Sequence, residues 1–445
     1  MRKESQICQK VAAERRANDF IEKRGKCVRL IYFVQYFLPE KASGLPLVLD
    51  MLEGFAKHGW KVDVYIPTPT RGMSDDVRKE YAKKRTERCF DGKLTIHRMH
   101  LYREGTGMLQ RTIRYCIFSL QCLLRGLFVP ADAIFTGGGQ PTQGIVAGLI
   151  HKWTKKKVIF NPQDLFPDSL VISGVVSESS KIVRIGRVME RFSYDNADSI
   201  ITITEDMADN IRSKIKEPDK VHVIRNWIDT DKIHPIARED NELFDELSLP
   251  HDRFYVTYAG NIGLMQGIET IIFAAEQLQE MPDIQFVLFG NGSEETNIRQ
   301  LIAKKRLTNV RLFPLQSAER VSEVYSLGDV SIVSCKPGTG SAGMPSKTWT
   351  IMACGTAIIG SFDLNCEFTR TIEAAQCGLC VEAGNVRALA NAILQMYNAP
   401  KQKEVFGNRA RQYAETQASK KKAVSKYITY IEEVVRANAS GDRVK

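Results

Sequence analysis

Short apolar runs of strand length alternate with longer stretches of helical periodicity along most of the chain. One such stretch, LPLVLDMLEGFAKHG (45–59), places its apolar residues at helical spacing. Short buried strands that alternate with helices predict parallel sheets built of right-handed βαβ units. The strand runs of the first half read VRLIYFV (28–34), KVDVYIP (61–67), KLTIHRM (93–99), DAIFTGG (132–138), KVIFNP (157–162), SIITIT (199–204) and KVHVIRN (220–226).

The pattern loosens after Asn226 and then starts again. Residues 227–252 are polar and contain two prolines, so we predict a linker there. A final helical stretch, 420–436, follows the last strand and is a candidate to cross back to the first half. The strand runs of the second series read FYVTYAG (254–260), IQFVLFG (284–290), NVRLFP (309–314), DVSIVSC (329–335), TAIIGS (356–361) and GLCVEA (378–383).

This alternation predicts an α/β fold of two doubly wound, Rossmann-like domains that face a central cleft. The predicted bounds are 28–226 and 253–419, with a basic N-terminal extension at 1–27, the linker at 227–252 and a C-terminal helical segment at 420–445. A chain of 445 residues is long enough, because single cores rarely grow beyond about 300 residues. Ligands of such sheets bind beyond the carboxyl ends of the strands.

Composition narrows the choice of partners. The chain is 43% hydrophobic and 26% charged, which is typical of a globular protein, and its formal net charge of +10 indicates an anionic partner. Nucleic acid, a membrane surface and a phosphorylated substrate all qualify, but no nucleic-acid-binding motif is present, so we expect no nucleic acid. Ten cysteines without a disulfide framework or zinc spacing fit a reducing cytoplasm.

Glycine-rich turns follow several of the predicted strands. Each places flexible backbone at the start of a helix, where free N–H groups and the helix dipole attract anions. Such turns are also glycine-rich for steric reasons alone, but five of them on the expected ligand side favour an anionic ligand in the cleft. They are KASGLP (41–46), GGGQPTQG (137–144), GNIGLMQG (260–267), GNGSEE (290–295) and KPGTGSAGMPSK (336–347).

The last of these turns, 336–347, has G-x-G-x-x-G spacing and leads into a helix predicted to start at Pro345, with Lys347 in its first turn. A lysine there opposes the helix dipole, and a bound anion would relieve that conflict. The spacing and Asp363 also fit a dinucleotide fingerprint. That fingerprint belongs in the first βα unit of a domain, whereas this turn lies in the fourth, so the match is weak. No Walker A sequence is present.

Together these segments resemble the GT-B-fold glycosyltransferases of family 4, especially those that make bacterial capsular polysaccharide and O-antigen. The resemblance spans about residues 29–436. It implies transfer of a sugar from a nucleotide diphosphate sugar, bound by the C-terminal domain, to an acceptor on the N-terminal domain, usually with retention and without a metal. The segments, in family order, are YFLPEKASG with LEGFAKHGWKVDVY, FNPQDLFPDSL, ADSIITITEDM, VIRNWIDTDK, YAGNIGLMQG, LFGNGSE, LGDVSIVSCKPG and MPSKTWTIMACGTAIIGS.

The resemblance places the donor on the glycine loops and on the helix start at MPSK. Many family members carry an Arg and a Lys where this chain has Asn261 and Gln266. Many also carry a glutamate pair where it has Ala342 and Thr350. The diphosphate charge then falls mainly to Lys347 and to backbone N–H groups. The implied substrate-binding residues are Gly44, from the N-terminal domain, and Gly260, Asn261, Gly263, Gln266, Gly290, Gly292, Gly343, Ser346, Lys347 and Thr350.

Two acidic residues in NPQDLFPDSL are the candidate catalytic residues. Asp164 and Asp168 follow a strand of the N-terminal domain, and either could receive a proton from the acceptor hydroxyl or orient it. The alternative for Asp168 is that it caps the next helix. No acids or histidines near the proposed diphosphate site have metal-ligand spacing, so we expect a metal-independent enzyme without a cofactor.

One helical stretch of the N-terminal domain mixes basic and bulky apolar residues. GMLQRTIRYCIFSLQCLLRGLFV (107–129) carries Arg111, Arg114 and Arg125, and the basic segment RKEYAKKRTER (78–88) precedes it. Together they could rest on an anionic membrane and admit a lipid-linked sugar. The alternative is a core helix with a solvated face. Its most apolar part, YCIFSLQCLLRGLFV (115–129), is shorter than the roughly 20 apolar residues that span a bilayer and carries Gln121 and Arg125.

We therefore predict a retaining hexosyl- or N-acetylhexosaminyl-transferase that uses a nucleotide diphosphate sugar, with UDP as the favoured nucleotide. Its acceptor would be a lipid-linked or other saccharide in cell-surface polysaccharide synthesis, and it would work in the cytoplasm, peripherally on the inner face of the cell membrane. Two alternatives stay open. A sugar-nucleotide epimerase of the same fold would need no acceptor, and a catalytically silent membrane-associated paralogue should bind no nucleotide sugar.

Overall fold

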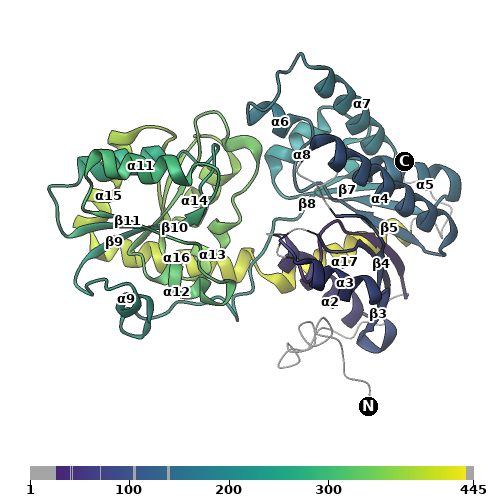
Figure 1. The fold of residues 1–445 in the computed structure, drawn as a ribbon, viewed down its shortest axis with the longest axis horizontal. Coiled ribbons are helices and arrows are strands. Elements are labelled where there is room, and N and C mark those ends of the chain that lie inside the picture. Colours follow the sequence, from purple (N-terminus) through teal and green to yellow (C-terminus); the bar gives the residue numbers. More distant parts are fainter. Residues whose placement is uncertain are drawn as a thin grey trace.

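Figure 1 shows two α/β domains side by side, each built around its own sheet, as in the predicted fold class. The predicted N-terminal extension, apart from Cys27, lies outside the described residues, and so do the centres of two predicted glycine turns and the last residues of the chain. The computed structural model describes residues 27–40, 42, 44–70, 72–103, 107–137 and 141–436.

The first domain contains an eight-stranded sheet in the order β3-β4-β2-β1-β5-β6-β7-β8. Every predicted run forms a strand, and all neighbours pair in parallel except β3 and β4, which are antiparallel. The apolar pattern does not predict β3, because this short edge strand reads TERC. The strands are β1 (Arg29–Phe33), β2 (Lys61–Pro67), β3 (Thr86–Cys89), β4 (Leu94–Met99), β5 (Ala133–Thr136), β6 (Lys157–Phe160), β7 (Ser199–Thr202) and β8 (Val221–Val223).

Helices cover both faces of this sheet. On one face, Phe55 of α2 and Tyr427 of α17 share a buried cluster with Phe135 of β5. On the other face, Phe118 of α4 shares a second cluster with Ile134 of β5, together with side chains of α5, α7 and α8. The helices are α2 (Leu45–Lys57), α3 (Asp75–Lys83), α4 (Met108–Phe128), α5 (Gln143–Thr154), α6 (Asp168–Ile172), α7 (Lys181–Asp195), α8 (Glu205–Arg212) and, from the end of the chain, α17 (Lys420–Arg436).

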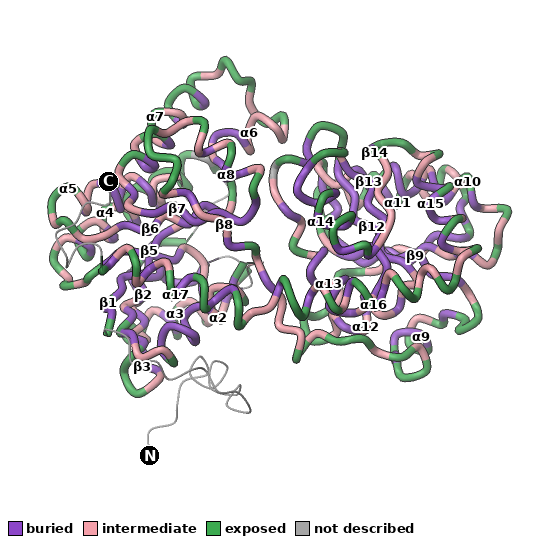
Figure 2. The backbone as a smooth tube through the Cα atoms, turned by 180° about the vertical axis from the view of Figure 1, so that it is seen from behind, coloured by how far each residue is buried: buried purple, intermediate pink, exposed green. Residues whose placement is uncertain are grey.

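The second domain contains a six-stranded, fully parallel sheet in the order β11-β10-β9-β12-β13-β14. All the predicted runs of the second series form its strands. Figure 2 shows the buried residues concentrated along the strands of both domains. The strands are β9 (Phe254–Asn261), β10 (Ile284–Asn291), β11 (Val310–Phe313), β12 (Val330–Ser334), β13 (Ala357–Phe362) and β14 (Gly378–Glu382).

Longer helices flank this second sheet, and short 3-10 turns occur in both domains. The helices are α9 (Leu243–Glu246), α10 (Ile268–Gln277), α11 (Glu295–Lys305), α12 (Val321–Ser326), α13 (Lys347–Ala353), α14 (Glu367–Ala375), α15 (Val386–Asn398) and α16 (Pro400–Gln417). The 3-10 turns are η1 (Phe90–Gly92), η2 (Pro218–Lys220), η3 (Arg238–Asp240), η4 (Ala318–Arg320) and η5 (Gly340–Ala342).

Two passages of chain join the domains. Residues 227–252, predicted as a linker, start with Trp227, which packs in the first core and donates a hydrogen bond to Asp50 at 2.8 Å. They end near α9, whose Phe244 is fully buried in the second core. The second passage leads from α16 into α17, which packs on α2. The contact is close at Gly54 of α2, where any side chain would overlap Val424 of α17.

Candidate active site

The loops after β9 and β10 form one tightly packed surface at the carboxyl edge of the second sheet. Gly260 pairs in register with Gly290, and a Cβ atom on Gly290 would overlap the carbonyl oxygen of Gly260. Gly292 has a φ of +156° and lies so close to Ile262 that a side chain would overlap the carbonyl oxygen there. Glycine is required at these positions because backbone packs directly on backbone.

The loop between β9 and α10 is held by hydrogen bonds to its carbonyl groups. The hydroxyl of Tyr258 donates to the carbonyl oxygen of Asn261 at 2.6 Å, and that of Ser334 donates to the carbonyl oxygen of Gln266 at 2.6 Å. The Asn261 side chain donates to that of Gln266 at 3.3 Å across Gly263. Asn261 and Gln266, both predicted to bind the sugar donor, therefore belong to one cluster of neutral polar groups with Tyr258 and Ser334.

Lys347 joins this cluster from α13. The helix starts at Lys347 itself, with Ser346 as its N-cap, two residues after the predicted start at Pro345. The Lys347 Nζ lies 3.8 Å from the ring centre of Tyr258. A Cβ atom added to Gly260 would lie 2.9 Å from the same Nζ. Burial lowers the pKa of Lys347 to about 7. Among the described residues this amine has no ion-pair partner, so no opposite charge offsets the desolvation that lowers its pKa.

The G-x-G part of the same turn is already satisfied within the protein. The backbone N–H groups of Gly338 and Gly340 donate to the Asp363 carboxylate at 3.0 Å and 2.7 Å. A carboxylate therefore occupies the position that a dinucleotide phosphate would need, and Asp363 serves this turn rather than a ribose. Gly343 and Thr350, the other predicted residues of this segment, lie after the satisfied glycines and on α13, and both are partly exposed.

The predicted catalytic residues lie across the cleft, in the N-terminal domain. Asp164 and Asp168 line a small pocket of about 80 Å³ at the domain junction, and Ser341 of the C-terminal domain closes it. Ser341 lies two residues before Gly343, so the junction brings Asp164 opposite the turn that leads to α13. Gly44, the remaining predicted residue, is the exposed N-cap of α2, where an added Cβ would meet nothing within 4 Å.

The two carboxylates have different surroundings. Asp168 accepts a hydrogen bond from Lys214 at 2.7 Å and forms an ion pair with Arg187. Desolvation would raise the pKa of Asp168, but the hydrogen bonds and charges of these two cations lower it. Asp168 is the first residue of α6, and Pro167 occupies the N-cap position, contrary to the capping alternative for Asp168. Asp164 is exposed on one side, and partial desolvation raises its pKa.

Ion pairs near this pocket join the domains, and sequence patterns give no sign of them. The Arg225 side chain donates to Glu367 at 2.8 Å, and the backbone N–H of Glu367 donates to Asp206 at 2.7 Å. Arg370 also pairs with Asp206. The partners are more than 140 positions apart in the chain. They hold the start of α14 against α8 and thereby fix the relative position of the two pocket walls.

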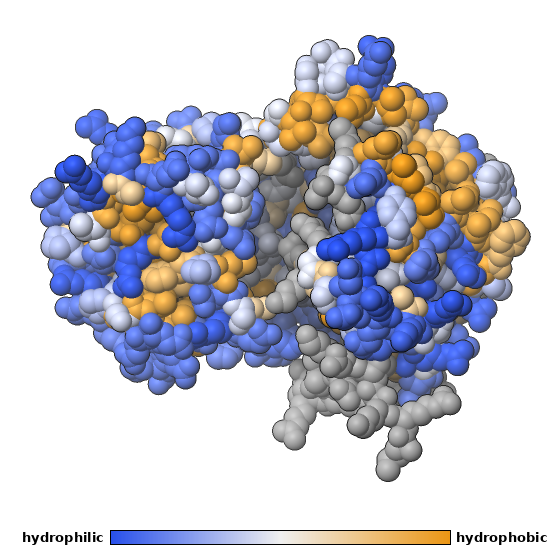
Figure 3. Space-filling model, in the orientation of Figure 1, coloured by the Kyte–Doolittle hydropathy of each residue, from blue (hydrophilic) through white to orange (hydrophobic). Residues whose placement is uncertain are grey.

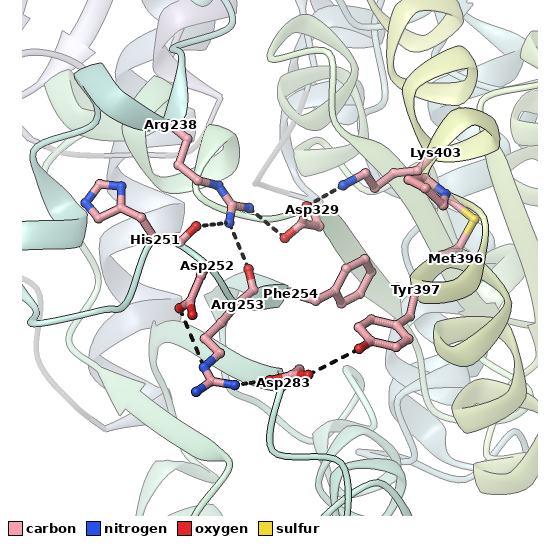
Figure 4. A pocket seen from close by; sticks show the side chains of 11 residues that line it. Arg238, His251, Asp252, Arg253, Phe254, Asp283, Asp329, Met396, Tyr397 and Lys403 are labelled. Carbon is pink, nitrogen blue, oxygen red and sulfur yellow. Dashed lines mark hydrogen bonds and ion pairs between the residues drawn. The ribbon is translucent and has the colours of Figure 1, made fainter.

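A larger pocket of about 280 Å³ lies at the opposite edge of the second sheet (Figure 4). Its charged side chains neutralise one another: Arg238 and Lys403 pair with Asp329, and Arg253 pairs with Asp283. Asp329 and Asp283 each precede a strand, so the pocket is at the amino ends of the strands, where such sheets do not bind ligands. We therefore regard this network as structural.

In the described part of the chain, no helix is long and apolar enough to cross a membrane. No group of three or more His, Cys, Asp or Glu side chains there is arranged to hold a metal ion.

Two family profiles match the chain, the glycosyl transferase 4-like domain over residues 46–227 and the glycosyl transferases group 1 over residues 239–413. The putative colanic acid biosynthesis glycosyl transferase WcaI of Escherichia coli (strain K12) is 27% identical over 412 residues, which cover 90% of this chain and 99% of that protein. Among solved structures, sucrose-phosphate synthase from Thermosynechococcus elongatus has a TM-score of 0.73 at 18% identity, over 92% of this chain and 100% of that one. Anabaena HepE in complex with UDP-glucose has a TM-score of 0.67 at 12% identity, over 91% and 100%.

The two sheets, with glycine loops on one side of the cleft and acidic side chains on the other, have the arrangement of the GT-B fold. The chain belongs to the family 4 (group 1) glycosyltransferases, enzymes that use nucleotide sugars as donors. The family that the sequence motifs resemble is thus confirmed.

Proposed function

We propose that this enzyme transfers a sugar, with retention, from a nucleotide diphosphate sugar to a lipid-linked or other saccharide acceptor in cell-surface polysaccharide synthesis. The name of the E. coli relative, which refers to colanic acid biosynthesis, supports a polysaccharide product. The UDP-glucose in the HepE structure supports UDP as the nucleotide and a hexose as the sugar. The enzyme would act in the cytoplasm, where nucleotide sugars are made.

The observation that carries the proposal is the position of Lys347. Its ammonium group lies at the start of a helix, between the Tyr258 ring and Gly260, and has no ion-pair partner among the described side chains. A diphosphate bound there would gain a charge-assisted hydrogen bond and the N–H groups of the neighbouring glycine loop. It would also restore the protonation that burial opposes at Lys347.

Beyond the Lys347 charge and the N–H groups of the glycine loop, sugar transfer needs little else from the residues that bind the nucleotide sugar. As the glycosidic bond breaks, negative charge develops on the leaving nucleoside diphosphate, and preorganised N–H donors with one cation stabilise it. The acceptor hydroxyl would enter from the N-terminal domain, where Asp164 has an exposed carboxylate opposite Ser341. Partial desolvation raises the pKa of Asp164, which suits a group that receives or orients a proton. Asp168, already paired with two cations, would position α6 rather than react.

The test is a screen of UDP- and GDP-linked sugars for thermal stabilisation, followed by product analysis with the sugar that stabilises most. A transferase should release nucleoside diphosphate only when an acceptor saccharide is present. Release of an isomerised sugar nucleotide without an acceptor would show an epimerase instead. If no nucleotide sugar stabilises the protein at millimolar concentration, the donor site is inactive and the proposal fails.

A further inference from the structure

Large apolar side chains that remain exposed gather on the N-terminal domain. Of the sixteen such side chains in the described part of the chain, twelve lie between residues 102 and 188. Figure 3 shows apolar surface along the upper and right-hand side of this domain, over α6, α7 and α4. Contiguous apolar patches on a soluble domain indicate an interaction surface.

Helix α4 contributes most of this surface. Its inner face is in the core, with Phe118 and Cys122 almost fully buried. Its outer face carries apolar side chains every three or four residues, from Leu109, which is 73% exposed, to Phe128, which is 79% exposed. The 21-residue helix contains no acidic residue. The exposed apolar residues of α4 are Leu109, Ile113, Ile117, Leu120, Leu124 and Phe128.

Two neighbouring helices extend the patch towards the cleft. Helix α5 packs between α4 and α7, so the three helices form one layer on this side of the sheet. Trp153 of α5 is exposed, and so are Ile182, Ile185 and Val188, which follow one stripe of α7. We call the exposed apolar side chains of α4, α5 and α7 the docking face.

The charges around the docking face are mostly positive. The two exposed acids on and just before α7 are each paired, Asp195 with Arg191 and Glu178 with Arg187. Arg114 is not part of this basic surface, although the sequence pattern groups it with the other two arginines of α4. Its guanidinium is buried and donates hydrogen bonds to backbone carbonyl groups. The exposed basic residues on the three helices and at the end of α5 are Arg111, Arg125, Lys152, Lys155, Lys181, Arg184 and Arg191.

We propose that the docking face lies in the headgroup region of an anionic lipid bilayer, with α4 and α7 in the membrane plane. Apolar side chains flanked by basic ones match that interface, where the apolar residues reach the acyl chains and the cations meet lipid phosphates. A second copy of this chain fits less well, because a symmetric interface would bring the same excess of positive charge together from both sides.

This orientation has a consequence for the acceptor, which rests on the proposed function. Helix α6, whose Ile172 lines the pocket with Asp164, precedes α7 by a short connection that carries the exposed Val175. The pocket therefore lies near the edge of the docking face. A saccharide on a lipid carrier would reach Asp164 while its acyl chains stay in the bilayer.

Sedimentation with vesicles tests the docking face without nucleotide or acceptor. The full chain should sediment with vesicles of phosphatidylcholine and phosphatidylglycerol. The triple variant Leu109→Gln, Leu120→Gln and Phe128→Gln should partition about a hundredfold less, because three apolar side chains no longer enter the bilayer. These side chains are exposed, so folding should be retained. The matched control is Leu315→Gln with Val405→Gln, exposed apolar residues of the C-terminal domain, which should bind like the parent.

The basic residues are tested by a second triple variant, Lys155→Gln, Lys181→Gln and Arg184→Gln, for which partitioning should fall about fivefold per charge at low salt. Transfer to a water-soluble acceptor should be unchanged in all variants, which separates this proposal from the proposed function. The docking proposal is overturned if the parent does not sediment, if the Leu109, Leu120 and Phe128 variant sediments like the parent, or if that variant instead converts a dimer into a monomer.

Discussion

The two domains repeat one design, but the loops at the carboxyl edges of their sheets are built from different parts. In the C-terminal domain the edge is mainly backbone, with Gly260, Gly290 and Gly292 packed against neighbouring backbone and the buried amine of Lys347 beside them. In the described part of the N-terminal domain, Gly137 also packs on the backbone of Asn161, but polar side chains are added at the edge. Gln163 there donates to the Asn161 side chain at 2.9 Å beside the exposed Asp164.

This difference agrees with the proposed division of labour. Backbone N–H groups cannot be changed by substitution, so a loop built from them suits a group that every donor shares, the diphosphate. Side chains can be exchanged without altering the fold, so a pocket that they line suits an acceptor that varies between enzymes. The exposed apolar side chains are also concentrated in the N-terminal domain.

The largest effect is expected on the transfer rate, from a substitution in the N-terminal domain, where side chains line the pocket. Asp164→Asn should slow transfer by about 10²–10⁴-fold, because the acceptor hydroxyl loses the group that receives or orients its proton. Its affinity for the nucleotide sugar should stay at the parental value, since the donor lies on the other domain. Single-turnover rates and calorimetric titration measure the two quantities. Asp209→Asn, on the exposed side of α8, is the control, and parental turnover in Asp164→Asn would remove this residue from the mechanism.

Substitution of Asp168, four positions away, should instead lower the free energy of unfolding. Removing a partner from a buried ion pair costs about 3–5 kcal/mol, but Lys214 and Arg187 keep Glu190 as a partner, so we expect Asp168→Asn to lose about 2–3 kcal/mol. The pKa of Asp168 is lowered in the folded state, so its contribution is present at neutral pH and is lost as the pH falls below about 4. Urea unfolding at pH 7 and pH 3 would show this. A parental midpoint at pH 7 would contradict the structural role.

On the backbone half of the site, Lys347→Ala should weaken nucleotide-sugar binding about ten- to hundredfold, the loss of one charge-assisted contact. The pKa of Lys347 is about 7, so the charged form declines as the pH rises above 7, and parental affinity should fall with it. The variant should show no such decline. Calorimetry between pH 6 and pH 9 gives both results, with Lys304→Ala on α11 as the control. Equal pH profiles for parent and Lys347→Ala would place the diphosphate elsewhere.

Protonation of Lys347 should favour diphosphate binding but lower the stability of the ligand-free protein. The folded pKa of Lys347 lies below the ordinary value of about 10.4, so the unfolded chain binds a proton more readily between these two values. Parental stability without ligand should therefore rise with pH across this range relative to Lys347→Ala. The variant should have the higher melting temperature at pH 6 and lose that advantage towards pH 10. A variant that is less stable at pH 6 would show that Lys347 is satisfied within the protein.

The smallest expected effect is that of removing metal ions. A hard cation on the diphosphate would need carboxylate ligands, whereas Asn261 and Gln266 are neutral and Lys347 would repel it. Transfer should therefore persist in excess EDTA at its parental rate. Activity that disappears in EDTA and returns with magnesium or manganese would show that the donor face is incomplete without a metal.

The positions of nearly all the strands in both domains follow from patterns that the chain carries locally. Strands such as β9 and β10 are continuous apolar runs because both of their faces are buried, and the turns after them are glycine-rich because backbone meets backbone there. Edge strand β3 has no such run, since half of its residues face solvent. Periodicity therefore finds buried strands and misses an exposed one.

The hydrophobic periodicity of the sequence does not show which partner each polar group has. Whether Asp168 reacts or is paired depends on Lys214, 46 positions away, and whether the G-x-G turn is free depends on Asp363. Arg114 and Arg125 look equivalent in the sequence, yet only the fold turns Arg114 inwards. The sequence by itself determined the two sheets and the glycine loops, because burial and backbone geometry act over a few neighbouring residues. The tertiary structure alone decided which charges remain available, because charge pairing acts between residues that only folding brings together.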